Sequence, residues 1–400
     1  MDGGLKTESQ NNNFLEKNLL VLTSCFPNQD NSIVGDPFVK TQIDEAKIYF
    51  KKIIVISPIL FSFGFLLNDK MCMNYHYENV EVYYPRCFYI PIFWTGQLVI
   101  DNRFKVVDRL IQKKQLTFDL IHAHFTWPSG NIGVRLKEKY GKPVIITIHE
   151  NGEWFDQEVG MDHPLINAAW CGANALIRVN RKDVPVLQRY NKCVYAIPNG
   201  FPPAFHPVDT AIARERLGLS AEKKIIFALG YLIKRKGFNY LIDAMKQICS
   251  QRNDVTCYIG GVGSERGSLQ GQIDRLHLME NVRLIGSVPS EVLSLWMNAC
   301  DLFVLPSLSE SFGVVQIEAL ACGKPVVATR NGGSEEVITS DEYGILVEPA
   351  DSGDLAEKIL IALDCEWDRA AILKYAQRFT WEKISKEIMG VYKQISQDLK

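Results

Sequence analysis

The sequence predicts an α/β protein with two doubly wound parallel sheets, each with helices on both faces. Short, nearly continuous apolar runs alternate with amphipathic stretches, a pattern typical of parallel strands buried on both faces. The runs form two series, separated by a segment that contains Pro202, Pro203 and Pro207. A chain of 400 residues is long enough for two domains that each bury a core.

The first series of strand candidates indicates an N-terminal Rossmann-like domain over residues 19–200. Its apolar runs are LLVLTS (19–24), KIIVIS (52–57), DLIHAH (119–124), PVIITI (143–148), ALIRV (175–179) and CVYAI (193–197). Residues 1–18 are polar and rich in asparagine, and they lack the basic-then-apolar order of a signal peptide. We expect them to form a disordered lead-in.

The second series predicts a C-terminal Rossmann-like domain over residues 224–378, after a hinge over 201–223. Its runs are KIIFALG (224–230), VTCYIG (255–260), VRLIG (282–286), LFVLP (302–306), PVVAT (325–329) and GILVEP (344–349). Residues 379–400 carry apolar side chains at helical spacing, which predicts a helix that packs back on the first domain. We expect the two sheets to face each other across a cleft.

Composition limits the partners and the compartment. The 44 basic and 46 acidic side chains leave a formal charge of −2, so the chain lacks the basic field that nucleic-acid binding requires. Ten cysteines without a C-x-x-C pair fit a reducing cytoplasm. The longest apolar stretches, Pro58–Leu67 and Phe88–Trp94, are shorter than the ~20 residues that span a bilayer. They allow peripheral association at the inner face of the cell membrane.

Ligands of open α/β sheets bind beyond the carboxyl ends of the strands, so polar residues that follow strands are informative. Gly35 lies in the loop after the first strand, where glycine permits close approach to a ligand or simply an ordinary turn. His149 follows PVIITI directly, and structural and functional roles are equally open for it. Arg235 and Lys236 precede a predicted helix, where they could bind a diphosphate or form a solvated basic loop.

The strongest pattern is PSLSESFGVVQIEALACGKP, residues 306–325, which leads from a strand through a glycine turn into a helix. Glu310 lies in the predicted loop and Glu318 a little over one turn into the helix, so their carboxylates could bind different parts of one long ligand. The backbone amides of Gly313, Val314 and Val315 would face phosphates between them. These features alone indicate a phosphate-containing ligand.

The stretch PSLSESFGVVQIEALACGKPVVAT, followed by GGSEEV (332–337), resembles the signature of the retaining GT-B glycosyltransferases of family 4. Further matches are HAHFTWPSG (122–130), ITIHENGEW (146–154), IPNGF (197–201) and IGGVGSERGSL (259–269), and together they cover nearly the whole chain after residue 18. The resemblance implies transfer of a hexose or N-acetylhexosamine from a UDP- or GDP-sugar to a glycan, a glycolipid or another acceptor, in surface polysaccharide or glycoconjugate biosynthesis.

The resemblance also implies roles for individual residues. Glu310 would contact hydroxyls of the donor sugar, and Glu318 would bind the ribose of the nucleotide. Lys236, helped by Arg235, would neutralise the diphosphate, which Gly35 would approach from the other side of the cleft. His149 would help to position the sugar and the acceptor.

Two departures from the family pattern affect these roles. Tyr231 stands where many members carry an arginine, so charge neutralisation depends more on the lysine of the same loop. Glu150 follows the histidine where many members have a glycine, which changes the local geometry on the acceptor side.

The sequence also allows other interpretations of the site and of the reaction. The absence of a D-x-D pattern predicts that no metal is needed, whereas His122, His124 and His149 could form a metal site on neighbouring strands. The same fold could host a nucleotide-sugar epimerase, a phosphorylase or an inert nucleotide-sugar-binding scaffold. A dinucleotide-dependent oxidoreductase is disfavoured because the glycines of GGVGSERG are spaced G-x-G-x-x-x-G.

Overall fold

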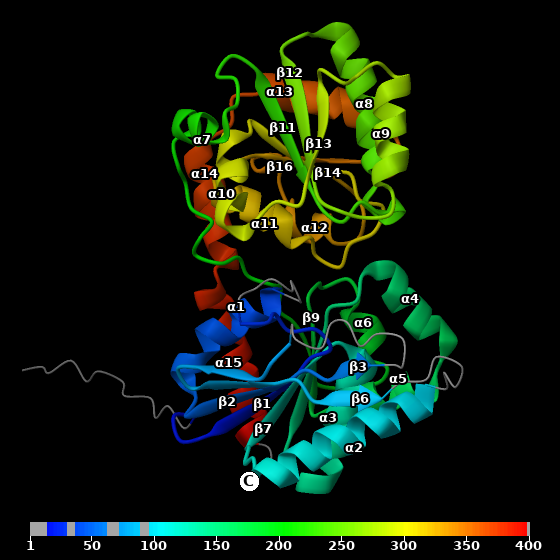
Figure 1. Cartoon of the computed structure of the whole chain (residues 1–400), viewed down its shortest axis with the longest axis vertical. Helices are drawn as coiled ribbons and strands as arrows, with labels where there is room; N and C mark the ends of the chain where they lie inside the picture. The colour runs from blue at the N-terminus through cyan, green and yellow to red at the C-terminus, as the bar shows by residue number, and fades with distance from the viewer. Residues whose placement is uncertain (1–13, 30–36, 62–71, 89–95, 398–400) are drawn as a thin grey trace, which may run out of the picture.

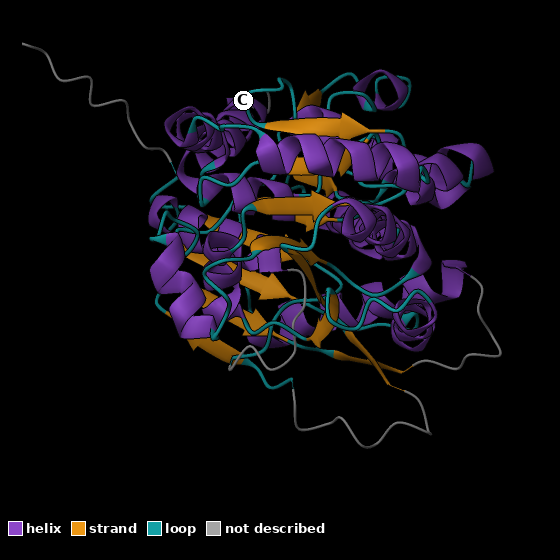
Figure 2. Cartoon of the chain, turned by 90° about the horizontal axis from the view of Figure 1, so that it is seen from above, coloured by secondary structure: helices purple, strands orange, loops and turns teal. Residues whose placement is uncertain are grey.

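The computed structural model describes residues 14–29, 37–61, 72–88 and 96–397. Two α/β domains lie one above the other, the first at the bottom of Figure 1 and the second at the top. Seen from above, helices flank the strands on both sides (Figure 2). The predicted α/β architecture with two parallel sheets is therefore confirmed.

The sheet of the first domain has eight strands in the order β10-β9-β8-β7-β1-β2-β5-β4, and only the edge strand β4 is antiparallel to its neighbour. Its strands are β1 (Asn18–Leu22), β2 (Lys52–Ile56), β4 (Tyr75–Tyr77), β5 (Val80–Tyr83), β7 (Leu120–His124), β8 (Val144–Ile148), β9 (Ala175–Arg178) and β10 (Val194–Ala196). Strands β3 (Ile59–Phe61) and β6 (Arg86–Phe88) form a separate parallel pair.

Helices cover both faces of this sheet because alternate strand residues point to opposite sides. Leu19 and Val21 pack in the core that includes α1 and α15, whereas Leu20 and Leu22 pack in the core that includes α2, α3 and α5. The helices of this layer are α1 (Pro37–Ala46), α2 (Gly96–Lys114), α3 (Asn131–Tyr140), α4 (Gly152–Met161), α5 (Pro164–Gly172), α6 (Val184–Leu187) and α15 (Trp381–Gln397). Shorter turns are η1 (Lys47–Tyr49) and η4 (Thr126–Gly130).

The sheet of the second domain has six parallel strands in the order β13-β12-β11-β14-β15-β16. They are β11 (Lys224–Leu229), β12 (Val255–Gly260), β13 (Val282–Gly286), β14 (Leu302–Leu305), β15 (Val326–Thr329) and β16 (Gly344–Val347). The helices are α7 (Thr210–Leu217), α8 (Phe238–Gln251), α9 (Arg266–Arg275), α10 (Ser290–Ala299), α11 (Val314–Ala321), α12 (Ser334–Val337), α13 (Ser352–Asp364) and α14 (Arg369–Ala376), with turns η5 (Lys234–Lys236) and η6 (Gln377–Phe379).

The chain crosses between the domains twice, and the two crossings are bonded to each other. The Phe201 amide donates to the carbonyl of Phe379 at 3.0 Å, and Phe201 forms an isolated parallel bridge with Thr380. A Cβ atom added to Gly200 would lie 2.7 Å from the Trp381 ring, so only glycine allows this close approach. After the second crossing α15, red in Figure 1, lies against the first domain.

Helix α15 also encloses residues near the start of the chain. Phe14 is 1% exposed and packs edge-on against Phe50, with ring centroids 5.6 Å apart. Strand β1 already begins at Asn18. Residues 14–18, which were expected to belong to a disordered lead-in, are therefore part of the fold, because Phe14 reaches an apolar site that the polar composition of the segment did not reveal. No helix within the described ranges is long and apolar enough to cross a membrane.

Candidate active site

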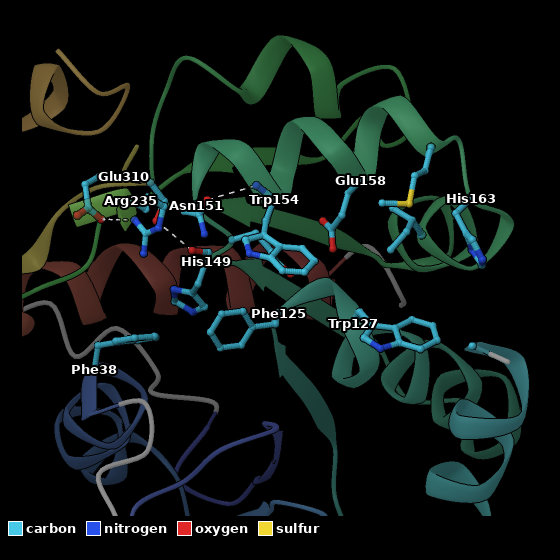
Figure 3. A pocket seen from close by; sticks show the side chains of 15 residues that line it. Phe38, Phe125, Trp127, His149, Asn151, Trp154, Glu158, His163, Arg235 and Glu310 are labelled. Carbon is cyan, nitrogen blue, oxygen red and sulfur yellow. Dashed lines mark hydrogen bonds and ion pairs between the residues drawn. The ribbon is translucent and has the colours of Figure 1, made fainter. Parts of the chain in front are cut away.

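A cavity of about 680 Å³ lies between the domains, at the carboxyl ends of strands from both sheets. Figure 3 shows Arg235 and Glu310 at one end, His149 and Phe125 near its middle, and Glu158 and His163 farther along. The described lining residues are Phe38, Gly96, Phe125, Trp127, His149, Glu150, Asn151, Trp154, Glu158, Met161, His163, Ile166, Arg235, Glu310 and Ser311.

Glu310 forms the charged centre of the second-domain wall. Its carboxylate is ion-paired with Lys236 and lies 3.6 Å from the Arg235 guanidinium. Burial raises the pKa of Glu310, but the charges of Lys236 and Arg235 outweigh burial and hold that pKa below its ordinary value. The pattern-based prediction placed these residues in separate loops, and the fold brings them into one cluster.

The two loops that carry this cluster are held together by backbone contacts. The Leu308 amide donates to the Arg235 carbonyl at 2.8 Å, and the Arg235 guanidinium donates to the carbonyl of Ser309. Gly237 has a φ of +65°, and a Cβ there would lie 2.0 Å from the Pro306 carbonyl oxygen. Only glycine therefore permits this approach of the loop before α8 to the loop after β14.

Helix α11 begins beside this cluster. Gly313 precedes the helix with a φ of +79°, so Val314 and Val315 present the unpaired amides of its first turn. Glu318 is half-buried on the same helix, and burial raises its pKa to about 8. Within the described residues its carboxylate has no hydrogen bond or ion pair. Glu318 does not line the 680 Å³ cavity, which puts it at a different part of the site from Glu310.

His149 lies at the first-domain wall, directly after β8. It is 7% exposed, and its ring packs against Phe38 and Phe125 at centroid distances of 4.6 and 5.1 Å. Burial lowers the pKa of His149 well below its usual range, so the imidazole is neutral. Its Nδ1 atom has no hydrogen-bond partner among the described residues. A neutral ring with one uncommitted nitrogen can bind a sugar hydroxyl.

The three histidines of neighbouring strands lie in a row, in which His122 stacks on His124 and His124 is hydrogen-bonded to His149. His124 Nδ1 lies 3.0 Å from His149 Nε2, while His122 bonds Tyr392 Oη at 2.6 Å and Thr147 Oγ1 at 2.7 Å. Both nitrogens of His122 are thus committed to protein groups. Across the described ranges, no three His, Cys, Asp or Glu side chains are placed to hold a metal ion. The alternative prediction of a three-histidine metal site is therefore wrong for this arrangement.

The loop that carries His149 is positioned by a buried arginine. Arg178 is fully buried and pairs with Asp183 at 2.6 Å. Its guanidinium also donates to the carbonyls of Ile148 and Glu150, at 3.0 and 2.7 Å. The end of β8 is thereby held in place before α4 begins at Gly152.

Two carboxyl groups of this wall were not predicted as site residues. Glu150 accepts a hydrogen bond from the Thr126 amide at 2.7 Å, and Glu158 is 8% exposed on α4. The Oε2 atoms of both have no partner among the described residues. Glu150 was noted only as a departure from the family pattern. Glu158 carried no signal, because a single glutamate in an amphipathic helix is commonplace.

The loop of Glu310 is bonded directly to the first domain. Ser311 Oγ donates to the His149 carbonyl at 3.0 Å, and the Glu153 amide donates to Ser309 Oγ at 3.2 Å. Asn180 Nδ2 donates to the Ser311 carbonyl, also at 3.0 Å. The fold thus brings His149, Arg235 and Glu310 around one cavity, with Lys236 behind them as the ion-pair partner of Glu310. Gly35 lies outside the described residues.

Two family models match the chain. The model described as Glycosyltransferase Family 4 matches residues 70–205, and the model described as Glycosyl transferases group 1 matches residues 209–379. D-inositol 3-phosphate glycosyltransferase 2 of Catenulispora acidiphila is 30% identical over 309 residues, which cover 71% of this chain and 72% of that protein.

Solved structures share the architecture. Sucrose-phosphate synthase from Thermosynechococcus elongatus superimposes with a TM-score of 0.78 at 22% identity, over 96% of this chain and all of that chain. HepE from Anabaena, in complex with UDP-glucose, superimposes with a TM-score of 0.70 at 25% identity, over 95% of this chain and all of that chain. The predicted GT-B fold is confirmed. The chain belongs to the glycosyl transferases group 1 and glycosyltransferase family 4, and it is a hexosyltransferase.

Proposed function

We propose that the protein transfers a hexose or N-acetylhexosamine from a UDP- or GDP-sugar to a glycan, a glycolipid or another acceptor, with retention of configuration. The observation that carries the proposal is the cluster of buried Glu310 with half-buried Lys236 and Arg235 beside the first turn of α11. It combines a sugar-binding carboxylate with cations and amides that suit a diphosphate. The HepE complex with UDP-glucose supports this class of donor.

In this proposal Glu310 binds hydroxyls of the donor sugar and Glu318 binds the ribose. Lys236 and Arg235 stabilise the diphosphate as it acquires negative charge, an interaction that is stronger in the transition state than in the bound donor. Amides from Gly313 to Val315 add to this stabilisation.

We propose that retention arises because the acceptor oxygen attacks the anomeric carbon from the same face that the leaving phosphate departs from. The bond between the anomeric carbon and the phosphate oxygen breaks, and the acceptor oxygen bonds to that carbon on the same face. The acceptor proton passes to the departing phosphate oxygen, and His149 positions the acceptor hydroxyl. An inverted linkage in the product would contradict this route.

We also propose that the reaction needs no metal ion, because Lys236 and Arg235 supply the positive charge that a divalent cation supplies elsewhere. Activity should persist in EDTA, measured as product formed from a labelled donor. Loss of activity in EDTA with recovery in Mg²⁺ or Mn²⁺ would refute this part.

The proposed setting is surface polysaccharide or glycoconjugate synthesis in the cytoplasm, with peripheral association at the inner face of the membrane. Cosedimentation with anionic lipid vesicles tests the association. Protein that stays in the supernatant at low salt would contradict it.

The experiment that tests the function is a donor screen with wild type and Glu318→Ala in parallel. UDP-glucose, UDP-N-acetylglucosamine, UDP-galactose and GDP-mannose are compared by thermal shift and by release of the nucleotide diphosphate. We expect one donor to raise the melting temperature of the wild type and Glu318→Ala to lose most of that response. The proposal fails if no donor is bound or cleaved.

A further inference from the structure

The first-domain wall of the cavity has a chemistry of its own, set by two carboxyl groups and two indole rings. Glu158 points into the cavity from α4, between Trp154 and His163 in Figure 3. Its exposed fraction is only 8%, and its Oε2 atom has no hydrogen-bond partner among the described residues. Glu150, whose Oε2 is equally unpartnered, lines the same cavity. Buried polar atoms without partners are rare unless a ligand or water completes them.

The two carboxyl groups of this wall are buried acids that keep a proton more readily than exposed ones. Burial raises the pKa of Glu158 to about 9, with Glu150 as a further cause, and burial also raises the pKa of Glu150. Near neutral pH the pair therefore holds at least one proton and can both donate and accept hydrogen bonds. Among the described lining residues Arg235 is the single Lys or Arg, and it is already bonded to Glu310 and Ser309.

Aromatic surface lies beside these carboxyl groups. Trp154 is 59% exposed, and Trp127 lines the cavity from the turn η4. An indole face offers an apolar surface to the C–H groups of a sugar ring, while nearby carboxyl groups bind its hydroxyls. A phosphate ester in this position would meet two acidic side chains, and the one arginine among the described lining residues is assigned to the donor diphosphate.

We infer that Glu150, Glu158, Trp127 and Trp154 form an acceptor subsite for an unphosphorylated sugar. The inference rests on the proposed function and adds the class of acceptor to it. It also sets the chain apart from D-inositol 3-phosphate glycosyltransferase and sucrose-phosphate synthase, each of which is named for a phosphorylated compound.

The test compares matched acceptors with the donor that the screen identifies. Free sugars, methyl glycosides and inositol are each paired with a phosphate ester, such as glucose with glucose 6-phosphate and inositol with inositol 3-phosphate. We expect product with at least one unphosphorylated member, and a kcat/KM at least about 100-fold lower for its phosphorylated partner. Preference for the phosphorylated member overturns the inference, as does transfer to no unphosphorylated member by protein that binds the donor.

Variants then locate the subsite. Glu158→Leu removes the hydrogen bonds and keeps a buried side chain of similar size, so the acceptor KM should rise about tenfold or more. Glu158→Gln can still donate and accept, and it should restore a KM close to that of the wild type. Trp154→Ala should raise the acceptor KM as well, while Asp156→Asn, an exposed position on the same helix, is the matched control.

Donor affinity, measured by calorimetry for each variant, separates the two proposals. Failure of the wild type to bind any nucleotide sugar refutes the proposed function. Normal donor binding by Glu158→Leu together with an unchanged acceptor KM refutes only the acceptor subsite.

Discussion

Lys236 and Glu310 bind each other beside the cavity, although each is also expected to bind the donor. An ammonium group has three donors, so Lys236 can keep its bond to Glu310 while it binds a phosphate oxygen. The pair thereby holds both side chains in place before the donor arrives. Preorganised charges of this kind need no rearrangement when charge develops in the transition state.

Lys236→Ala should lower kcat by about 10² to 10³, because it removes a charge that stabilises the leaving diphosphate. Initial rates at saturating donor measure the effect. Lys234→Ala is the matched control, since Lys234 is exposed in the same turn η5 and should keep the wild-type rate. Equal rates for Lys236→Ala and the control would remove Lys236 from the mechanism.

If Glu318 binds the ribose as proposed, donor binding should depend on pH. Two ribose hydroxyls can both donate to Glu318 only when it is ionised, and its pKa in the free protein is about 8. Below that pKa binding must release a proton, so the donor Kd should fall as pH rises from 6.5 to 8, by up to about tenfold per pH unit, and then level off. Isothermal titration in buffers of different ionisation enthalpy measures the proton release.

Glu318→Gln is the control for this pH dependence, because an amide does not titrate. Its donor Kd should be weaker than that of the wild type and flat over the same range. A wild-type Kd that is equally flat would show that Glu318 does not bind the ribose in its ionised form.

At the residue scale, sequence reasoning succeeded where spacing along one segment placed the side chain. Glu310 and Glu318 follow one strand and share one stretch of chain, so a loop and a helix suffice to locate them. The contact of Glu310 with Lys236 links residues 74 positions apart and depends on how two strands lie in the sheet. Glu158 was missed for a related reason: its burial depends on how α4 packs on the rest of the first domain, which no local pattern encodes.

At the scale of elements, the glycine before α8 keeps the two site loops in contact. Gly237 and Gly218 both have a φ of +65°, but a Cβ at Gly218 meets no atom within 4 Å, whereas one at Gly237 meets the Pro306 carbonyl. Gly218→Ala should therefore cost only the left-handed backbone strain, about 1 kcal/mol. Gly237→Ala should cost clearly more and should also weaken donor binding.

Urea unfolding of the two alanine variants, with donor titration alongside, measures this difference. Equal losses of stability would mean that the loops separate at no cost. Donor affinity unaffected by Gly237→Ala would mean that their contact is irrelevant to the site.

Strands buried on both faces were the elements easiest to predict. All six strands of the second sheet and six of the first coincide with the apolar runs. Strands β4 and β5 were missed, because Tyr75–Tyr77 is short and partly exposed and Val80–Tyr83 alternates apolar and polar residues. Strands at a sheet margin bury one face only, and their composition resembles that of a loop.

At the scale of the whole molecule, α15 joins the end of the chain to the core of the first domain. The Tyr392 hydroxyl forms a buried hydrogen bond with His122 Nδ1. The Tyr195 hydroxyl donates an exposed hydrogen bond to Gln394 Oε1. Tyr392→Phe should lower the free energy of unfolding by about 1 to 3 kcal/mol, because His122 Nδ1 loses its closest partner in the core. Tyr195→Phe should cost less than about 0.5 kcal/mol.

Chemical denaturation followed by tryptophan fluorescence measures both tyrosine variants. Similar losses for the two would show that the buried bond adds nothing beyond an exposed one. If Tyr392→Phe shifts the unfolding transition of the first domain and leaves that of the second domain unchanged, α15 stabilises the first domain only.

The bonded pair of crossings at Phe201 and Thr380 also determines how the domains can move. Two hydrogen-bonded segments that connect two domains form a hinge. The hinge bends easily in one direction and resists twisting or sliding of one domain against the other. We therefore expect the domains to move by a swing about a single axis through Gly200 and Phe379. Such a swing would separate Ser311 from His149 without twisting the domains. When the cleft closed again, the first-domain wall and the second-domain wall would meet in the same alignment as before.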